Sequence, residues 1–325
     1  MSHITHALVY SAAETVKIAE IPLDALESGQ VRVKSRFSGL SRGTERLVFH
    51  GLVPPSEWRR MRAPMQVGDF PFPVRYGYAA VGEVQEGPSD LLGRDVFCLH
   101  PHQADFHAPA DFVVPVPAGV DPAMAILGAN METALNALWD AGDVTGRRVL
   151  IVGTGLLGWL IAALLSRQPG SDVCVTDLRP ETVEMADHFG VGFVSPEDVP
   201  KEGFDLAFHT SASEAGLQTA LDALAFEGRL VELSWFGDKR VNIALGGGFH
   251  ANRLQIISSQ VGHVSPARRA TTTHKDRLAE ALNYLDDPRL TALVTEDVAF
   301  RDLPAAMPRL LGLAAPGIAT RIVYT

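Results

Sequence analysis

Cysteine is scarce in this chain, and its scarcity limits the classes of protein to which the chain can belong. Only two cysteines, Cys98 and Cys174, occur among 325 residues. Two isolated thiols build neither a disulfide framework nor a cysteine-based zinc cluster. Each lies inside an apolar, strand-like run, so we expect both thiols to be buried and unreactive.

Positive charge is also in short supply. The chain carries 28 Lys and Arg against 38 Asp and Glu, for a formal net charge of −10. A nucleic-acid interface needs basic faces that attract the phosphate backbone, so this balance argues against a nucleic-acid partner. We interpret the short basic runs at 59–62 and 268–269 as solvated surface.

Signals of export and of membrane insertion are missing as well. No basic segment followed by an apolar stretch opens the chain, so a cytoplasmic location is the expectation. Residues 149–165 are almost wholly apolar and nearly long enough to span a bilayer. Three glycines in the first half of this stretch favour a buried strand, a tight turn and a buried helix instead. We therefore expect a soluble protein with no membrane contact.

The patterning that is present predicts two domains of an α/β protein. Hydrophobic residues make up 46% of the chain and charged residues 20%, as in globular proteins. Up to about residue 116, short apolar runs separated by Gly and Pro indicate β structure. From residue 148 onward strands and helices alternate, which favours a doubly wound parallel sheet. We predict one domain over 1–120 plus 290–325, and a second over 121–289.

The expected elements of the second domain follow from the same patterning. Strands are expected at 149–152, 173–177, 206–209, 230–234 and 254–259, and helices at 131–140, 157–167, 180–189 and 214–225.

A glycine-rich motif, Gly-Thr-Gly-Leu-Leu-Gly beginning at Gly153, joins an apolar strand to an apolar helix. A lone G-x-G-x-x-G is weak evidence, but this strand–turn–helix context is the one that dinucleotide binding requires. Gly153 permits the tight turn, Gly155 lets the backbone approach a pyrophosphate, and Gly158 lets helix and strand pack closely. Leu156 and Leu157 open the helix, whose free N–H groups attract phosphate.

The choice of dinucleotide depends on the end of the next strand. Asp177 lies about 20 residues beyond the glycines, where an acidic residue accepts the ribose hydroxyls. A carboxylate there repels a 2′-phosphate, so NAD is favoured over NADP. The nearby Arg179 would favour a 2′-phosphate and so weaken the preference for NAD. The alternative is that the glycines form a simple turn in an unrelated α/β fold, and that Asp177 only caps the helix that begins at Pro180.

Several motifs resemble those of the medium-chain dehydrogenase/reductase superfamily, whose best-known members are the alcohol dehydrogenases. Residues 38–45 (SGLSRGTE), with Gly51 following, resemble its G-[IL]-C-x-[ST]-[DE] segment. Residues 77–84 (GYAAVGEV) resemble its G-H-E-x-x-G-x-V segment, residues 92–97 its G-D-R-V, and residues 129–138 its entry helix. The resemblance implies a GroES-like β-rich catalytic domain followed by a Rossmann dinucleotide-binding domain.

The zinc ligands of that family are replaced in this chain. The first cysteine position holds Ser41 or Arg42, the His-Glu pair is Tyr78-Ala79, and the later cysteine aligns with Ala129, although Glu132 lies nearby. The family's four-cysteine structural loop is absent. A zinc site needs three or four converging ligands, so we predict a zinc-independent enzyme without a metal site. His100 and His102, in one loop, favour hydrogen bonding over metal binding.

Without zinc, hydrogen-bond donors must stabilise the negative oxygen that develops on the substrate. Thr44 matches the family's Ser/Thr, which bonds the substrate oxygen and relays its proton. Tyr78 occupies a former ligand position, and Arg42 would supply a cationic donor. The alternatives are a packed core aromatic for Tyr78 and a salt bridge from Arg42 to Glu45 or Glu83.

Further residues are assigned to cofactor and substrate through the same resemblance. Thr133 matches a position near the nicotinamide amide, and Thr210 and Ser211 would lie by the nicotinamide ribose. Trp235 would form an aromatic wall of the substrate pocket or, alternatively, pack in the core.

We therefore expect an alcohol dehydrogenase-like oxidoreductase that transfers hydride between NAD(H) and a carbonyl or secondary alcohol of a small-molecule substrate. The bulky 54–73 loop suggests a substrate larger than ethanol. The segments at 38–45 and 77–84 are also similar to those of bacteriochlorophyllide dehydrogenase. Two short motifs do not identify a substrate, so the substrate stays open. A quinone or enone reductase using NADPH is the alternative enzyme, and a non-catalytic dinucleotide-binding redox sensor is an alternative of another class. The family habit of edge-to-edge pairing suggests a homodimer through 254–259.

Overall fold

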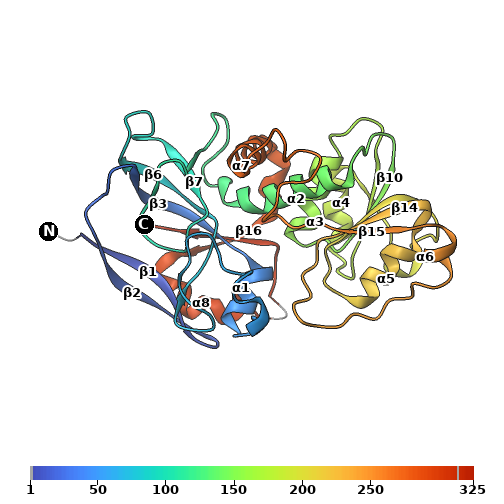
Figure 1. Cartoon of the computed structure of the whole chain (residues 1–325), viewed down its shortest axis with the longest axis horizontal. Coiled ribbons are helices and arrows are strands. Elements are labelled where there is room, and N and C mark those ends of the chain that lie inside the picture. The colour runs from blue at the N-terminus through green and yellow to red at the C-terminus, as the bar shows by residue number, and fades with distance from the viewer. Residues whose placement is uncertain (1–2, 313–314) are drawn as a thin grey trace. The chain divides into compact units, whose positions relative to one another are not determined.

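The computed structural model describes residues 3–312 and 315–325 and divides into two compact units. Unit 1 comprises Met1–Ala129 and Thr291–Thr325, and unit 2 comprises Asn130–Leu290 (Figure 1). The boundary expected from the sequence lay earlier, between residues 120 and 121. It differs because the 3-10 helix η2 (Ala125–Leu127) packs on two strands of unit 1, β3 (Gln30–Leu40) and β6 (Ala80–Glu86).

Two sheets make up most of unit 1. The larger has the order β16-β17-β3-β6-β7-β9, with β8 also paired to β3, and the smaller has the order β2-β1-β5-β4. Their remaining strands are β1 (His3–Ala12), β2 (Thr15–Leu23), β4 (Val67–Gly68), β5 (Val74–Arg75), β7 (Asp95–Cys98), β8 (Asp105–Pro109), β9 (Val114–Pro115), β16 (Val294–Ala299) and β17 (Ala319–Val323). Because β17 pairs antiparallel with β3, the C-terminal segment belongs to the same sheet as the N-terminal strands.

A short helix in unit 1 was not predicted from the β signals of the first 116 residues. Helix α1 (Arg42–Phe49) buries Glu45, Val48 and Phe49. The periodicity was invisible in the sequence because one of these inward positions carries a carboxylate rather than an apolar side chain. This helix matters for function, since both Arg42 and Thr44 lie on it. Unit 1 also contains helix α8 (Leu303–Leu310) and the 3-10 helices η1 (Pro55–Glu57) and η6 (Phe300–Asp302).

Unit 2 is built on the doubly wound parallel sheet that the alternating pattern predicts. All neighbouring strands are parallel, in the order β12-β11-β10-β13-β14-β15. The strands are β10 (Arg148–Val152), β11 (Asp172–Thr176), β12 (Gly192–Phe193), β13 (Phe204–His209), β14 (Leu224–Glu232) and β15 (Gln255–Ser258). Central β10 is buried on both faces from Val149 to Val152, which explains its continuous apolar run.

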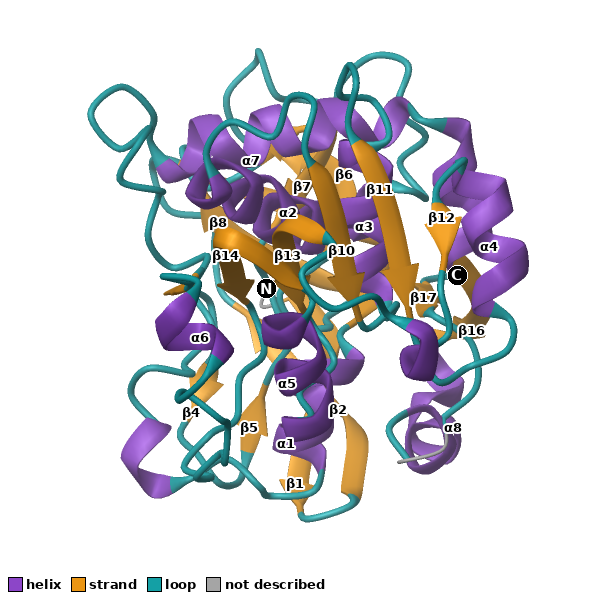
Figure 2. Cartoon of the chain, turned by 90° about the vertical axis from the view of Figure 1, so that its right-hand side faces the viewer, coloured by secondary structure: helices purple, strands orange, loops and turns teal. Residues whose placement is uncertain are grey.

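Helices cover both faces of this sheet, as a doubly wound fold requires. Figure 2 shows α5 (Glu214–Asp222) in front of the strands and α3 (Leu156–Leu165) behind them. The other helices of unit 2 are α2 (Gly128–Ala141), which begins at the unit boundary, α4 (Thr182–Phe189), α6 (Gly248–Ala251) and α7 (His274–Asn283), with 3-10 helices η3 (Pro196–Asp198) and η4 (Tyr284–Asp286). The 3-10 helix η5 (Pro288–Leu293) crosses the second unit boundary, between residues 290 and 291. Helix α7 was not predicted, although Thr273 and Asp276 form the capping box that begins it.

Two composition-based expectations can be compared with the structure. Cys98 is buried, but Cys174 is only half-buried, so the expectation of a buried thiol was wrong for Cys174. Burial nevertheless raises the pKa of the Cys174 thiol to about 11, which keeps it protonated at neutral pH. No helix in the described part of the chain is long and apolar enough to cross a membrane.

Candidate functional site

The glycine-rich turn between β10 and α3 has the geometry of a phosphate cradle. Gly153 has a φ of +98°, and a Cβ there would lie 2.7 Å from the backbone nitrogen of Ser211. A Cβ at Gly158 would collide with the carbonyl oxygen of Gly153. Gly155 is exposed and has nothing near its would-be Cβ, and no side chain caps the helix that follows. The turn therefore leaves open backbone at a helix N-terminus, which fits a pyrophosphate.

Asp177 lies directly beside this turn. It follows β11, and its carboxylate accepts hydrogen bonds from the Thr154 N–H at 2.6 Å and from the Arg179 N–H at 3.0 Å. The Arg179 guanidinium pairs with the same carboxylate at 3.0 Å. Burial alone would raise the pKa of Asp177, but the hydrogen bonds from Arg179 and Thr154 outweigh it and lower the pKa.

The alternative role for Asp177, as a helix cap, was wrong. The residue at the N-cap of α4 is Glu181, four residues further along the chain. Asp177 instead closes a local turn through the Arg179 N–H and anchors the glycine-rich segment through Thr154. Asp177, which the sequence singled out as a ribose ligand, thus lies at the glycine-rich turn. Its negative charge is already paired with Arg179.

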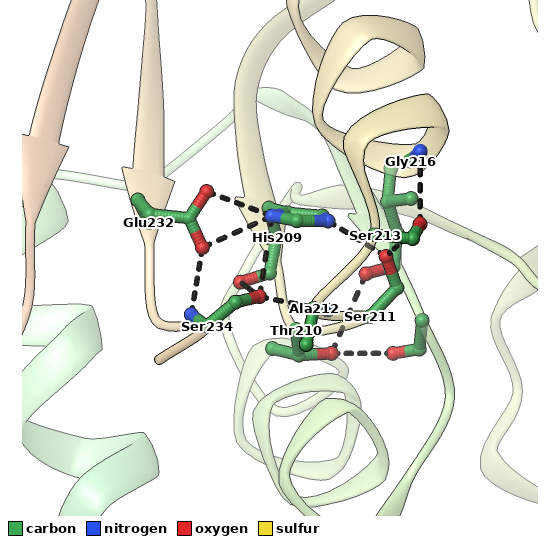
Figure 3. A network of polar contacts seen from close by, with 10 residues as sticks. His209, Thr210, Ser211, Ala212, Ser213, Gly216, Glu232 and Ser234 are labelled. Carbon is green, nitrogen blue, oxygen red and sulfur yellow. Dashed lines mark hydrogen bonds and ion pairs between the residues drawn. The ribbon is translucent and has the colours of Figure 1, made fainter. Parts of the chain in front are cut away.

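A polar network lies at the carboxyl ends of β13 and β14 (Figure 3). The imidazole of His209 has Glu232 at 2.7 Å from Nδ1 and the Ser211 hydroxyl at 2.6 Å from Nε2. Ser234 donates its N–H to Glu232 at 2.6 Å, and the Thr210 hydroxyl donates to the Gly153 carbonyl at 2.6 Å. Thr210 and Ser211 were candidates from the sequence and do lie against the glycine turn.

His209 and Glu232 were missed by the sequence reasoning. They are the last residues of adjacent strands and lie opposite each other in the register. The available signal was that each directly follows a short apolar run, 206–208 in β13 and 230–231 in β14, at the carboxyl edge of the sheet where ligands gather.

The other candidates in unit 2 lie in different surroundings. Thr133 is half-buried on α2. Its neighbour Glu132 is buried and pairs with Arg277 at 3.0 Å, so its carboxylate is engaged within the helical layer. Trp235 is 39% exposed, so the alternative that it packs in the core was wrong. The ring that stacks near the polar network is Phe236, whose centroid lies 6.2 Å from that of His209.

In unit 1, Thr44 and Tyr78 are brought together by a chain of hydroxyls. The Tyr78 hydroxyl donates to Thr44 Oγ1 at 3.1 Å and also forms a short hydrogen bond with Ser41 Oγ. Since Tyr78 gives its proton to Thr44, Ser41 is the donor to Tyr78. Burial raises the pKa of Tyr78, an effect that its bonds to Ser41 and Thr44 only partly offset. The phenol is therefore protonated at neutral pH.

Arg42 points its guanidinium toward the C-terminal segment. Its Nη1 donates to the carbonyl oxygen of Gly317 at 2.6 Å. The two acids considered as salt-bridge partners have other contacts: Glu45 pairs with His102 at 2.9 Å, and Glu83 accepts from Gln85 at 2.9 Å. The structure thus brings Thr44 and Tyr78 together and directs Arg42 to the backbone before β17.

The two loop histidines are both engaged in internal contacts. His102 is fully buried and bonds Glu45 through Nε2 and Ser38 Oγ through Nδ1, the latter at 2.8 Å. His100 bonds the carbonyl of Pro101 at 2.9 Å and stacks on Phe106. Over residues 3–312 and 315–325, no group of three or more His, Cys, Asp or Glu is placed to hold a metal ion.

A surface hollow lies in the 54–73 loop of unit 1. It has a volume of about 280 Å³ and is lined by Trp58, Arg59, Arg62, Asp69 and Phe70. Aromatic rings link its wall to the hydroxyl chain: Phe70 and Tyr76 lie 5.7 Å apart, and Tyr76 and Tyr78 lie 6.2 Å apart, between centroids.

Comparisons with known proteins agree with this architecture. No family model matches the chain. D-guloside 3-dehydrogenase of Escherichia coli is 24% identical over 78% of this chain and 80% of its own. The 2-desacetyl-2-hydroxyethyl bacteriochlorophyllide A dehydrogenase of Cereibacter sphaeroides is 26% identical over 70% of this chain and 73% of its own.

L-idonate 5-dehydrogenase (NAD(P)(+)) of Escherichia coli matches in both sequence and structure. In sequence it is 25% identical over only 38% of either chain. A crystal structure of L-idonate 5-dehydrogenase from this species superposes with a TM-score of 0.81 over 99% of both chains, at 17% identity. The chain therefore has the two-domain fold of the alcohol dehydrogenases, a β-rich domain with a parallel-sheet Rossmann domain. Its relatives support the medium-chain dehydrogenase/reductase superfamily and a dehydrogenase reaction.

Proposed function

We propose that the chain is a dehydrogenase that transfers hydride between NAD(H) and a carbonyl or secondary alcohol without catalytic zinc. The observation that carries the proposal is the bond from the Thr154 N–H to the Asp177 carboxylate, 2.6 Å long. It joins the two halves of a dinucleotide site, the glycine turn for phosphate and the acid for ribose, in one rigid unit. The dehydrogenase names of the relatives support the same reaction class.

The residues around the turn would hold the coenzyme. The N–H groups at Gly155, Leu156 and Leu157 would bind the pyrophosphate, and Asp177 would accept hydrogen bonds from the hydroxyls of one ribose. When bound, the nicotinamide supplies or accepts the hydride. Asp177 favours NAD(H), while the nearby Arg179 guanidinium lessens the repulsion of a 2′-phosphate, since it already neutralises the carboxylate.

The hydroxyl chain of unit 1 would manage the proton of the substrate. Because Thr44 accepts from Tyr78, its own O–H remains available as a donor to the substrate oxygen. A protonated Tyr78 behind it strengthens that donor, since hydrogen bonds in a chain polarise one another. In the direction of reduction, Thr44 would steady the developing alkoxide and pass it a proton. Tyr78 would return a proton to Thr44, Ser41 would return one to Tyr78, and solvent would return one to Ser41. Thr133 and Arg42 stay secondary candidates for contacts to coenzyme and substrate.

Zinc independence is supported by the side chains at the former ligand positions. Ser41 and Tyr78 bond each other, Ala79 and Ala129 have no donor atoms, and Glu132 is paired with Arg277. Hydroxyl donors would replace the Lewis acid in stabilising the oxyanion.

The substrate is proposed to be larger than ethanol. The hollow in the 54–73 loop is lined by the aromatic residues Trp58 and Phe70, by Arg59, and by Arg62 and Asp69, which form an ion pair. Such a lining suits a ring or chain that carries an anionic or hydroxylated end. The ring series from Phe70 through Tyr76 to Tyr78 connects this hollow with the hydroxyl chain, and we propose that one extended substrate contacts both. Trp235, exposed on unit 2, is a further candidate for substrate contact.

The test is a panel assay with purified protein. NADH or NADPH is mixed with ketones, enones and quinones, and the loss of reduced coenzyme is followed by absorbance. Turnover of ketones by protein that elemental analysis shows to be metal-free supports the proposal. Turnover confined to enones or quinones with NADPH would identify the alternative reductase. Tight coenzyme binding without any turnover would identify a redox sensor, and stoichiometric zinc would overturn the metal-free mechanism.

A further inference from the structure

The direction of the hydrogen bonds around His209 can be deduced from its partners. Glu232 accepts at both carboxylate oxygens, which lie 2.7 and 3.0 Å from Nδ1. A carboxylate only accepts, so Nδ1 carries a ring proton. With that one ring proton Nε2 is an acceptor, and the Ser211 hydroxyl, 2.6 Å away, donates to it.

This assignment leaves Ser211 as an acceptor toward its surroundings. Its single proton points to His209, so the 2.9 Å bond between Ser211 and Ser213 must be donated by Ser213. Ser213 in turn accepts the Gly216 N–H at 3.0 Å. The Ser211 oxygen has two lone pairs, and one of them accepts the hydrogen bond from Ser213. The exposed Ser211 therefore presents one lone pair to a ligand that donates a hydrogen bond.

The fold places this acceptor against the phosphate turn. A Cβ on Gly153 would lie 2.7 to 2.9 Å from three atoms of Ser211, so the turn and the serine are in direct contact. Ala212 adopts a left-handed φ of +53°, which holds the sharp bend after Ser211, and its N–H is bound by Ser234 at 3.0 Å. Asp177 follows β11, on the other side of β10, so a dinucleotide with its pyrophosphate on the turn would have one half near each residue.

We infer that Ser211 accepts a hydrogen bond from a hydroxyl of the nicotinamide ribose, and that His209 and Glu232 are positioning residues that hold Ser211 in this polarity. The inference rests on the proposed function, because it presumes a bound nicotinamide dinucleotide. A ribose hydroxyl donates, as the lone pair requires. A phosphate or carboxylate only accepts hydrogen bonds, so it would face the lone pair of Ser211 and be repelled by the charge of Glu232. We call the chain from Glu232 through His209 to Ser211 the relay. The relay thus selects a neutral hydroxyl-bearing group at this strand end.

A cycle of protein and coenzyme changes tests the contact. Binding of NADH and of analogues that lack one or the other hydroxyl of the nicotinamide ribose is measured by calorimetry for the full chain and its Ser211→Ala variant. One deoxy analogue is expected to bind wild type about tenfold more weakly than NADH, the size of one hydrogen bond. Ser211→Ala should bind that analogue and NADH equally. Ser195→Ala, another serine of unit 2, is the matched control and should discriminate as wild type does.

The positioning role is tested by ¹⁵N spectra of the His209 ring. In wild type Nε2 is expected to be unprotonated, and Glu232→Gln should lose this preference together with part of the discrimination between NADH and the deoxy analogue. A proton found on Nε2 in wild type, or equal loss of affinity for NADH and both analogues in Ser211→Ala, would overturn the inference while leaving the dehydrogenase proposal intact. If wild type binds neither NADH nor NADPH, the proposed function fails and the inference fails with it.

Discussion

In the proposed mechanism, Thr44 donates to the substrate oxygen because of the groups that surround it. Its oxygen accepts from Tyr78, whose phenol is kept protonated by burial and by the nearby carboxylate of Glu45. Glu45 itself is fully buried, and it is held by Tyr10 at 2.6 Å and by His102 at 2.9 Å. The charge of that carboxylate discourages ionisation of the tyrosines nearby, so the hydroxyls stay protonated.

Removing the Thr44 hydroxyl should therefore impair chemistry rather than binding. We expect Thr44→Val to lower kcat by about 10²-fold, the usual effect of losing one oxyanion donor. Thr44→Ser keeps the hydroxyl and should retain most of the activity. The measurement is steady-state kinetics with a ketone from the panel, together with coenzyme affinity by calorimetry. An unchanged kcat in Thr44→Val would remove this residue from the mechanism.

Coenzyme preference should depend on the Asp177–Arg179 pair. Asp177→Ala removes the ribose acceptor and leaves Arg179 unpaired, so the ratio of NADH to NADPH affinity should fall by about tenfold. Arg179→Ala leaves the carboxylate without its cation and should shift the ratio toward NADH. Dissociation constants for both coenzymes measure the two shifts. A wild type that already prefers NADPH would contradict the assignment of Asp177.

The elements that carry these residues differ in how easily they are read from the chain. Strand β10 and helix α3 are recognisable in the sequence as an apolar run interrupted by glycines, because nearly all of their residues are buried. Helix α1 does not, since Glu45 occupies an inward position where an apolar residue is expected. The element that presents Thr44 was therefore hidden from sequence reasoning.

Strand β15 is the edge of the unit 2 sheet, and we propose that it pairs with a second copy of the chain. It bonds only β14 within the described chain, and its Ile256 is 37% exposed. A lysine on an edge strand opposes pairing with another strand. Ile256→Lys is expected to convert the dimer to a monomer in analytical ultracentrifugation.

The matched control is Leu92→Lys, which changes an apolar residue that is 54% exposed in unit 1. It should leave the association state of the protein unaltered. A wild type that sediments as a monomer, or an Ile256→Lys variant that remains dimeric, would rule out the β15 interface.

Across the whole molecule, buried His100 should contribute to sensitivity toward acid. Burial lowers its pKa from the ordinary 6.5 to about 3. Because the folded state disfavours the proton, this residue adds nothing to the loss of stability above about pH 6.5. Below that value the unfolded chain gains a proton that the folded chain refuses, and stability falls by up to about 1.4 kcal/mol per pH unit until about pH 3.

Replacing the imidazole by a ring that cannot be protonated should flatten this dependence. His100→Phe preserves stacking on Phe106 but loses the bond to the Pro101 carbonyl. We expect it to be less stable than wild type at pH 7 and to lose less stability between pH 6.5 and 4, measured by urea unfolding. An identical slope in both proteins would show that His100 is not responsible.

The sequence by itself determined the parallel sheet, the glycine turn and the acid beside it. These depend on local causes: apolar periodicity, the backbone freedom of Gly153 and Gly158, and a fixed spacing to Asp177. It also brought Thr44 and Tyr78 forward, through their places in motifs.

Only the tertiary structure decided which of these side chains meet and which way their protons point. Tyr78 reaches Thr44 because α1 lies beside the segment before β6, and His209 meets Glu232 because β13 and β14 pair in one particular register. Such contacts depend on pairing and packing between segments tens of residues apart. No local pattern encodes that register, which is why the relay to Ser211 came to light only in the folded chain.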